Sequence, residues 1–460
     1  MPKLLTIAAL DTKCEIDMRH PPLGIGYLSA SVKRAFGDRF DIRLEVRDVE
    51  AALDRWRPDA VLISSTSPRF DIAHRYATLA HARGLPVVVG GIHISMLPHS
   101  LYPEMTVGVI GEGERTLIEL LELYLETKGF PQERLAGIQG LCYRREEDGD
   151  LVLTEPRPCM TPLDDIPLPD RSLMPIRPHT YMFTSRGCPF KCRFCASTRF
   201  WPGKVRFFSA ERVVDEIELL IKDFDVRVIS FHDDLFVADQ DRLHEIARLM
   251  ERRNLLNKVT FTCNARANIV TDELCKVLKH IGVASVNMGL ESGSDKTLAW
   301  LKGNVTVAQN ENAILCIRRH GMQAQGSFII GAPDETEDDI EETYRFIKRM
   351  PLSIVDVNLL LPYPGTAVWD IALEKGLVSN DMDWGQLTYD VRVDPMRYLN
   401  MSNHVSTERL VKLHSRFMRL RYWKIMKGIV HHPYKRDLVK WGARYVAEYF
   451  RRDRKPACAE

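Results

Sequence analysis

Short apolar runs alternate with amphipathic stretches over the first third of the chain. The apolar runs have the length and the Val, Ile and Leu content of buried strands, and they lie at residues 3–10, 41–46, 60–64, 86–89 and 106–110. Between them, apolar positions recur at helical spacing at residues 22–36, 49–56 and 72–82. The alternation predicts an α/β domain with a doubly wound, Rossmann-like parallel sheet. Ligands of such sheets bind beyond the carboxyl ends of the strands.

The same rhythm returns after residue 180. Further strands are predicted at residues 181–185, 226–231, 258–262, 284–288, 325–330 and 355–361. Helices are predicted at residues 210–223, 240–253, 272–280, 307–320, 338–350 and 367–375. These successive βα units indicate a partial (β/α)6 barrel of the TIM type. The residues that act in such barrels lie on the loops after the strands, and most of those loops are polar or rich in Gly and Pro here.

A segment of different character joins the two α/β regions. It begins with a hairpin-like pair of apolar runs and continues into a proline-rich stretch at 156–178, which should be extended and semi-rigid. We therefore expect four parts: a first domain at 1–140, a connector at 141–179, a barrel at 180–376 and a mainly helical segment at 377–460. With 460 residues, of which 45% are hydrophobic and 27% charged, the chain can bury a core in each α/β domain.

The net charge of +1 is unevenly distributed. Residues 406–460 contain 15 Lys and Arg against 5 Asp and Glu, a charge of +10, so the preceding 405 residues carry −9. This basic segment is also rich in aromatic residues, and such a mixture can hold a helix at an anionic membrane surface as a peripheral contact. The other interpretation is a helical cap with a basic solvated face and aromatic residues packed inward. No nucleic-acid partner is expected.

The sequence is typical of a cytoplasmic protein, with or without membrane association through its basic end. No run approaches the roughly 20 apolar residues that cross a bilayer, and the amino terminus lacks the pattern of a secretory signal. Ten cysteines, three of them clustered, fit a reducing compartment and a metal site better than a disulfide framework. Five others are interpreted as ordinary small residues, mostly buried: Cys142, Cys159, Cys263, Cys275 and Cys316.

The clustered cysteines, Cys188, Cys192 and Cys195, have C-x3-C-x2-C spacing directly after a predicted strand. Three thiolates can hold one iron–sulfur cluster and leave one iron without a protein ligand, where a substrate could bind. A zinc site would need a fourth ligand. The next candidates, Cys159 and His232, are not at finger-like spacing. The remaining alternative is three unrelated buried thiols.

An aromatic residue, Phe194, stands just before the third of these cysteines. With it, the motif resembles the signature of the radical S-adenosylmethionine (SAM) superfamily. The resemblance implies a [4Fe-4S] cluster on the three cysteines, with SAM bound at the open iron. It also implies reductive cleavage of SAM to a 5′-deoxyadenosyl radical, which abstracts hydrogen from an unactivated carbon. The cofactor carries this step, while the protein supplies position and excludes water.

The same resemblance implies SAM contacts at the ends of the barrel strands. Asp233 or Asp234 is expected near the amino group of SAM, Arg266 near its carboxylate and Glu291 on the ribose hydroxyls. The run 326–333 would lie against adenine. Taken singly, each of these loops could instead be an ordinary helix cap or turn. The expected SAM residues are Phe194, Asp233, Asp234, Asn264, Arg266, Glu291, Ser292, Gly326, Ile329, Gly331, Pro333 and Tyr363.

Four pieces of the first domain resemble the cobalamin-binding domain that precedes the radical SAM domain in one large subfamily. They are Pro21-Pro22-Leu23-Gly24, Pro58-Asp59-Ala60-Val61, Val89-Gly90-Gly91-Ile92-His93 and Ile110-Gly111-Glu112-Gly113-Glu114. Glycines at the strand ends let backbone approach a large flat ligand. The residues that the resemblance places around cobalamin are Pro22, Leu23, Ser65, Thr66, Arg69, Gly90, Gly91, His93, Gly111, Glu112 and Gly113.

One departure concerns the ligand of cobalt. The Asp-x-His-x-x-Gly motif of other cobalamin proteins is absent, because no Asp stands two residues before His93 or any other histidine of this domain. Bound cobalamin should therefore carry no protein histidine on cobalt. Arg69 is the only charged side chain of the loop at 65–70, and an arginine cannot readily lose its proton to become a ligand. The alternative is that Arg69 merely faces solvent.

The resemblance implies a cobalamin-dependent C-methyltransferase of the class B type in a biosynthetic pathway. An alternative within the same class is SAM radical chemistry without methyl transfer, such as ring closure, C–C coupling or rearrangement. A non-catalytic iron–sulfur sensor is the alternative outside enzymes, although a sensor has no use for a ring of SAM-binding residues. The expected partners are a small-molecule, lipid or peptide substrate and an electron donor such as flavodoxin or ferredoxin.

Overall fold

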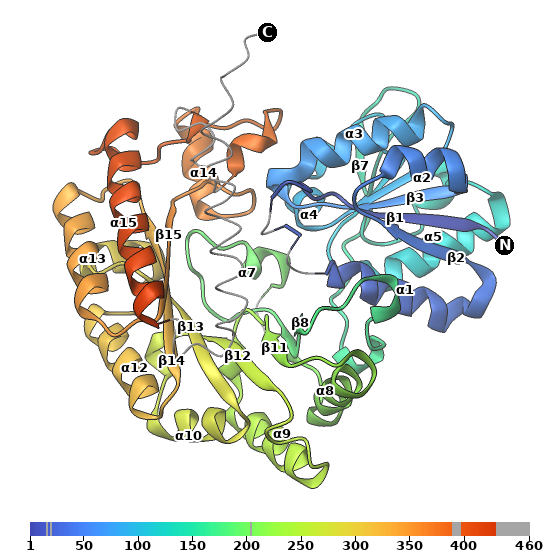
Figure 1. Ribbon diagram of the computed structural model, residues 1–460. Helices are drawn as coiled ribbons and strands as arrows, with labels where there is room; N and C mark the ends of the chain where they lie inside the picture. Colours follow the sequence, from blue (N-terminus) through green and yellow to red (C-terminus); the bar gives the residue numbers. More distant parts are fainter. Residues whose placement is uncertain (15–16, 19–20, 203–204, 389–396, 429–460) are drawn as a thin grey trace.

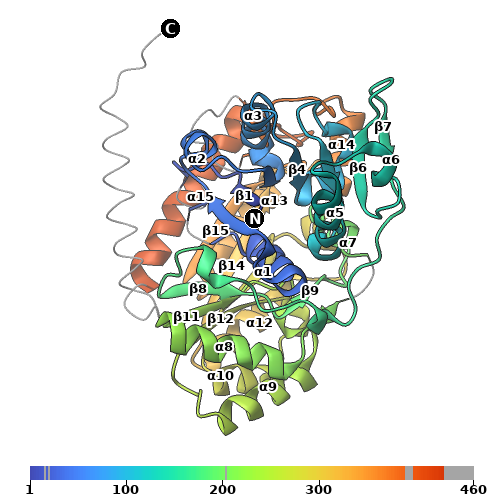
Figure 2. The same ribbon diagram turned by 90° about the vertical axis from the view of Figure 1, so that its right-hand side faces the viewer.

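The computed structural model describes residues 1–14, 17–18, 21–202, 205–388 and 397–428. Two α/β units lie side by side, each built on its own sheet (Figure 1). The first unit is the blue and cyan part of the chain, and the second, from green to orange, curls around the opposite side. A quarter turn of the molecule shows α8, α9 and α10 on the side of the second unit that lies away from the first (Figure 2).

The first sheet has the strand order β2-β1-β3-β4-β5-β6-β7. Its strands are β1 Lys3–Ala8, β2 Asp41–Glu45, β3 Ala60–Ser64, β4 Val87–Gly90, β5 Val107–Val109, β6 Leu141–Arg144 and β7 Leu151–Leu153. The first five are parallel, and the order reverses beside β1, which makes the crevice between the ends of β1 and β3 the switch point of a doubly wound sheet. The predicted fold class is confirmed for this unit.

The hairpin expected in the connector is part of this first sheet. Strand β6 pairs antiparallel with β5, and β7 pairs antiparallel with β6. The helices of the unit are α1 Leu23–Phe36, α2 Val49–Trp56, α3 Phe70–His81, α4 Ile92–Met96, α5 Gly113–Thr127 and α6 Gln132–Leu135. The apolar pattern predicts α1, α2 and α3, whereas α4, α5 and α6 were not predicted.

The second sheet is a fully parallel, partial barrel with the order β8-β11-β12-β13-β14-β15. Its strands are β8 His179–Met182, β11 Val228–Phe231, β12 Thr260–Ala265, β13 Val283–Glu291, β14 Gln323–Ile330 and β15 Ile354–Leu359. The helices are α8 Ala210–Phe224, α9 Gln240–Arg252, α10 Asp272–His280, α11 Asp295–Lys302, α12 Val307–Arg319, α13 Glu337–Arg349 and α14 Ala367–Glu374. All six predicted strands are present, so the partial barrel is confirmed.

Local signals explain where the barrel helices begin. The side chains of Thr306 and Thr336 each accept a hydrogen bond from the backbone amide three residues ahead. The side chains of those residues, Gln309 and Asp339, in turn accept from the backbone amides of the two threonines. These capping boxes satisfy amide groups that a helix start leaves free. Short 3-10 helices add further turns: η1 Gly37–Arg39, η2 Ser67–Arg69, η3 Pro98–Ser100, η4 Leu163–Asp165, η5 Arg171–Leu173, η6 Phe236–Ala238, η7 Ala267–Ile269 and η8 Trp384–Leu387.

A small antiparallel pair frames the cysteine motif. Strand β9 Ser185–Arg186 pairs with β10 Arg206–Phe207, and the cysteines and the short helix α7 Ser197–Phe200 lie in the chain between them. This pair was not predicted, because two-residue strands carry no periodic pattern.

The carboxyl-terminal segment packs on the last strand of the barrel. Helix α15 Thr407–Gly428 lies along β15, where the His414 Nε2 atom is 2.9 Å from the Val357 carbonyl oxygen (Figure 1). The expected basic and aromatic end at 429–460 lies outside the described residues. Among the described helices, none combines the length and the apolar content needed to cross a bilayer.

Candidate functional site

The strand ends of the two units face each other across an apolar contact. One hydrophobic cluster joins Phe70 and Ile94 of the first unit to Leu360 and Trp369 of the second. Met96 of α4 lies so close to the loop after β15 that a Cβ on Gly365 would collide with its side chain. The edges at which each fold binds its ligands therefore lie next to each other.

The three cysteines of the motif converge beside the barrel. All three are partly buried, and each of Cys188 and Cys195 lies close enough to Cys192 for its charge to act on their pKa values. Burial raises the pKa of Cys195 to about 11, with contributions from Asp234 and the other two thiols. Three negatively charged thiolates this close together and partly buried would be unfavourable without a neighbouring positive charge. The three cysteines therefore suit a site in which metal ions neutralise the thiolates.

The structure separates the two neighbouring aspartates. Asp233 is buried, and its carboxylate accepts hydrogen bonds from the amides of Thr184 at 2.6 Å and Ser185 at 2.7 Å and from the Thr184 hydroxyl at 2.6 Å. It thereby holds the start of the cysteine loop. Asp234 points the other way and accepts from the Ser197 hydroxyl at 2.6 Å, near Cys188 and Cys195. Asp234 is thus the member of the pair that faces the cysteines.

Arg266 lies against the cysteine loop. Its Nη1 atom is 3.3 Å from the Cys192 Sγ, its Nη2 atom donates to the Lys302 carbonyl oxygen at 3.1 Å, and its guanidinium lies 4.0 Å from the ring centre of Phe190. The Nε–H of Arg266 is buried without a protein partner. An arginine with an unused donor beside three thiols fits a ligand carboxylate at this position.

Glu291 ends β13 in a left-handed backbone conformation, with φ of 60°. Its carboxylate is buried and 3.5 Å from the Nζ atom of Lys302. Burial raises the pKa of Glu291, while the charges of Lys302 and Arg266 act in the opposite direction. Lys302, which stands at the end of α11, was not predicted to lie at this site, because nothing in the local sequence marks it as a neighbour of Glu291.

The other expected SAM residues fall into two groups. Phe194, Ile329 and Tyr363 pack against the apolar cluster between the units. The rest are engaged within the barrel: the Asn264 side chain donates to the Asp233 carbonyl oxygen at 3.2 Å, and the Ser292 hydroxyl is 2.9 Å from that of Thr343. The remaining contacts concern backbone. Gly326 lies against Leu290, the Gly331 amide donates to Glu335 at 2.6 Å, and the Pro333 carbonyl oxygen accepts from Asn403 at 2.8 Å.

The strand-end edge of the first sheet, which faces the barrel, is lined by glycines and small polar residues. Gly91 has φ of 103°, and a Cβ there would lie 2.5 Å from the Ser65 carbonyl oxygen, so the ends of β3 and β4 meet only through glycine. Gly111 has φ of 79° and open space where a side chain would be. Gly90 and Thr66 flank this edge in the same loops. Backbone with open space beside it fits a large flat ligand such as a corrin.

His93 is not free to bind cobalt. It is fully buried in the first unit, its Nδ1 atom is 3.1 Å from the Ser67 hydroxyl, and its Nε2 atom is 2.9 Å from the Ser100 hydroxyl. Its ring stacks on Phe70 with centroids 3.8 Å apart, and burial lowers the pKa of His93 to about 3. A neutral ring with both nitrogens engaged agrees with the missing histidine motif.

Arg69 does not face bulk solvent. Its Nε atom is 2.6 Å from the Asp17 carboxylate, and both side chains are 12% exposed. Its charge also reaches the hydroxyl of Tyr363 in the second unit, where burial raises the pKa to about 12 and Arg69 acts to lower it. The arginine therefore stands at the boundary of the two strand-end edges.

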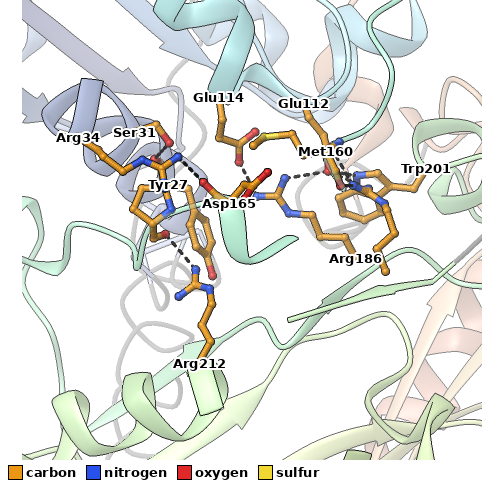
Figure 3. Close-up of polar contacts among 12 residues, drawn as sticks. Tyr27, Ser31, Arg34, Glu112, Glu114, Met160, Asp165, Arg186, Trp201 and Arg212 are labelled. Atoms are coloured by element: carbon orange, nitrogen blue, oxygen red, sulfur yellow. Dashed lines mark hydrogen bonds and ion pairs between the residues drawn. The ribbon is translucent and has the colours of Figure 1, made fainter. Parts of the chain in front are cut away.

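The Glu112 side chain is part of a polar network between the units (Figure 3). It accepts from Arg186 at 2.8 Å, from Arg206 at 2.8 Å and 3.0 Å, from the Trp201 indole at 3.2 Å and from the Met160 amide at 2.7 Å. Glu114 pairs with the second nitrogen of Arg186 at 2.5 Å. These contacts tie the loop after β5 to β9 and β10, so only the backbone of Gly111 to Gly113 remains for a ligand.

Two neighbouring features lie apart from the strand ends. The Leu23 amide donates to the Tyr181 hydroxyl of β8 at 3.5 Å, and that hydroxyl donates to the Pro21 carbonyl oxygen, so Pro22 lies between two anchored residues. The Leu23 side chain is buried in the core of the second unit. A cavity of about 360 Å³ lies beside Glu114 between α1, α5 and the connector. Neither the cysteines nor the expected SAM residues line it, so the cavity is separate from the cysteine site.

Two protein-family models match this chain, one in each α/β unit. The B12 binding domain model matches residues 13–121, and the Radical SAM superfamily model matches residues 182–347. The two matches define a radical SAM protein with an amino-terminal B12-binding domain. They imply a [4Fe-4S] cluster, SAM and cobalamin as cofactors.

Relatives of known sequence narrow the assignment. An uncharacterized methyltransferase of Pyrococcus horikoshii is 31% identical over 409 residues, which cover 85% of this chain and 86% of that protein. The anaerobic magnesium-protoporphyrin IX monomethyl ester cyclase of Cereibacter sphaeroides is 28% identical over 77% of this chain and 61% of its own. The chain belongs to the family of cobalamin-binding radical SAM methyltransferases.

A solved structure has the same fold. The radical SAM methyltransferase TsrM from Kitasatospora setae, with cobalamin and a [4Fe-4S] cluster bound, superposes with a TM-score of 0.67 at 18% identity. The match covers 87% of this chain and 81% of that one.

Proposed function

We propose that this protein transfers a methyl group from cobalamin to an unactivated carbon of its substrate. The observation that carries the proposal is the apolar contact between the units, in which Phe194 of the cysteine motif packs against the cluster that contains Phe70 and Ile94 of the first unit. When bound, the cluster and SAM supply the radical that removes hydrogen from carbon, and cobalamin supplies the methyl group. Substrate between the two edges would meet both cofactors in turn.

The chain's own residues have positioning tasks in this proposal. Cys188, Cys192 and Cys195 hold the cluster. Arg266 binds the SAM carboxylate with the donors that the protein leaves unused, and Glu291 accepts from the ribose hydroxyls. Asp234, which faces the cysteines, is favoured over Asp233 for the SAM amino group.

The apolar contact between the units limits the entry of water. Phe194, Ile329 and Tyr363 belong to it, and a reactive carbon radical needs a dry site that prevents side reactions. The expected partners are a small-molecule, lipid or peptide substrate and an electron donor such as flavodoxin or ferredoxin.

Anaerobic reconstitution tests this function. Protein with bound cluster and cobalamin, incubated with reductant and SAM labelled with deuterium in its methyl group, should release 5′-deoxyadenosine and S-adenosylhomocysteine. In the presence of a candidate substrate, mass spectrometry should find a product heavier by one labelled methyl group. The variant Cys192→Ala is the control, because it should lose all three products. Cobalamin binding without any labelled product, across substrates that do stimulate 5′-deoxyadenosine release, would contradict methyl transfer.

That last outcome would favour a second candidate function. The relative from Cereibacter sphaeroides, which aligns over 77% of this chain, is named as a cyclase. In that case the product should have lost two hydrogens and gained no carbon.

A further inference from the structure

Four potential metal ligands meet on the outer surface of the barrel, away from the cysteine motif. Helix α10 brings Asp272 and Cys275 together at its first turn, and helix α12 with the residue after it brings Cys316 and His320 together one turn apart. The ligand atoms of Cys275, Cys316 and His320 all lie within 4.8 Å of one another. Among the described residues, this is the cluster of His, Cys, Asp and Glu that is compact enough for a single ion.

Three contacts among these side chains are as short as the edges of a tetrahedral site. The Sγ atoms of Cys275 and Cys316 are 3.6 Å apart, the Cys316 Sγ is 3.4 Å from the Asp272 Oδ1, and that oxygen is 3.6 Å from the His320 Nε2. In a tetrahedron with Zn–S bonds of about 2.3 Å and Zn–N or Zn–O bonds of about 2.1 Å, neighbouring ligand atoms lie about 3.3–3.8 Å apart. These three contacts fall in or near that range before any ion is added. Asp272 lies outside the compact set of Cys275, Cys316 and His320, so its side chain, which is 52% exposed, would shift to complete the tetrahedron.

The histidine is oriented as a ligand. Its Nδ1 atom is 3.0 Å from the Cys316 carbonyl oxygen, to which it donates, and its Nε2 atom faces Asp272. Metal-bound histidines are commonly fixed through a hydrogen bond from their other nitrogen. The side chain of His320 is 19% exposed and that of Asp272 is 52% exposed, which leaves a path for an ion from solvent to the buried thiols.

We propose that Asp272, Cys275, Cys316 and His320 bind one Zn²⁺ ion, a second metal site distinct from the iron–sulfur centre. Two thiolates, one imidazole and one carboxylate form a closed set of four, which is the arrangement of structural zinc rather than of a catalytic site with an open position. The site clamps α10 to α12, which flank strands β12, β13 and β14.

The charges around the site agree with a cation. Cys275 and Cys316 are buried, and the Asp272 carboxylate is 3.4 Å from the Cys316 Sγ. A divalent ion bound there would replace the thiol protons and be neutralised by the thiolates and the carboxylate. Arg319 would compete with the ion for Asp272, since its Nη2 atom is 3.4 Å from Asp272, but its side chain is 62% exposed and can move aside.

Elemental analysis of the full-length protein tests the site. The anaerobically purified protein with its cluster should contain about one zinc per chain in addition to iron. Cys316→Ser and His320→Ala should each lose most of the zinc while iron content stays unchanged. His320 is near the surface, so its variant should fold even if the cysteine variant does not. Cys142→Ser, at a buried cysteine of the first unit, is the matched control and should keep both metals.

A second variant separates this proposal from the proposed function. Replacing Cys188, Cys192 and Cys195 by Ala should remove iron and leave zinc, whether or not the enzyme transfers methyl groups. X-ray absorption at the zinc edge should then show sulfur neighbours at about 2.3 Å.

Three outcomes would overturn the zinc site. They are the absence of zinc from wild-type protein produced with zinc present, the retention of zinc in both Cys316→Ser and His320→Ala, and a Cys275–Cys316 disulfide in anaerobically purified protein.

Discussion

The carboxylate of Glu112 should be worth several kcal/mol to the contact between the two units. It is nearly buried and accepts from two arginines, an indole and a backbone amide. Burial alone would raise the pKa of Glu112, but the hydrogen bonds and charges of Arg206 and Arg186, with the Met160 amide, outweigh it and lower the pKa to about 2. A shift of that size corresponds to about 3 kcal/mol. Removing one partner of a buried ion pair costs a similar amount.

Glu112→Gln therefore tests the network directly, because it keeps the shape of the side chain and removes its charge. We expect the free energy of unfolding, measured by urea denaturation, to fall by about 3 kcal/mol. Hydrogen exchange should also accelerate in β9 and β10, which the network holds. The control is Glu126→Gln, since Glu126 is 60% exposed and pairs at the surface with Arg134, which is 57% exposed. That change should cost less than about 1 kcal/mol.

The effect depends on pH with a definite sign. The folded-state pKa of Glu112 lies below its ordinary value of 4.5, so the stabilisation is fully present above about pH 4.5 and is lost as the pH falls through about 2. The difference between wild type and Glu112→Gln should stay constant from pH 7 to pH 5 and shrink below that range. Equal unfolding midpoints for the two proteins at pH 7 would refute the reasoning, and so would a difference that grows on acidification.

Three further predictions concern the cofactors. Cys192→Ala should abolish iron retention and SAM cleavage, and near-normal iron in that variant would contradict the cluster assignment. Arg266→Ala and Glu291→Ala should keep the cluster absorbance. The binding free energy of SAM, measured by equilibrium dialysis, should weaken by about 2 kcal/mol or more, because each variant loses a charged hydrogen bond. Normal SAM binding by both variants would show that these residues are not part of the SAM site. Arg69, paired with Asp17, should leave cobalt without a protein ligand, so electron paramagnetic resonance of the cob(II)alamin form should lack strong nitrogen coupling from a lower ligand.

The sequence predicted the sheets well because buried parallel strands are nearly continuous apolar runs. The six barrel strands and the first five strands of the other sheet follow from that pattern alone. The sequence could not decide whether Asp233 or Asp234 faces the cysteines. Adjacent residues point to opposite sides of the chain, and only the surrounding contacts determine which side holds the cysteines. The cobalamin motif pointed to Glu112, but the arginines that engage it lie more than seventy residues away.

Long-range pairs explain the other differences. Cys275 and Cys316 are 41 residues apart and belong to two helices with ordinary amphipathic patterns, so nothing local marks them as neighbours. The same holds for Lys302 beside Glu291, because α11 between them was not predicted.

The hairpin β6–β7 bears on how this protein can be divided. Gly108 and Val109 of β5 pair with Cys142 and Leu141, and the buried side chains of Leu141 and Tyr143 belong to the core of the first unit. A fragment that stops at residue 140 would expose the backbone of β5 as an open sheet edge and uncover apolar surface, a combination that promotes self-association. A fragment that runs through residue 155 keeps that edge covered and is the one to prepare for measuring corrinoid affinity in isolation.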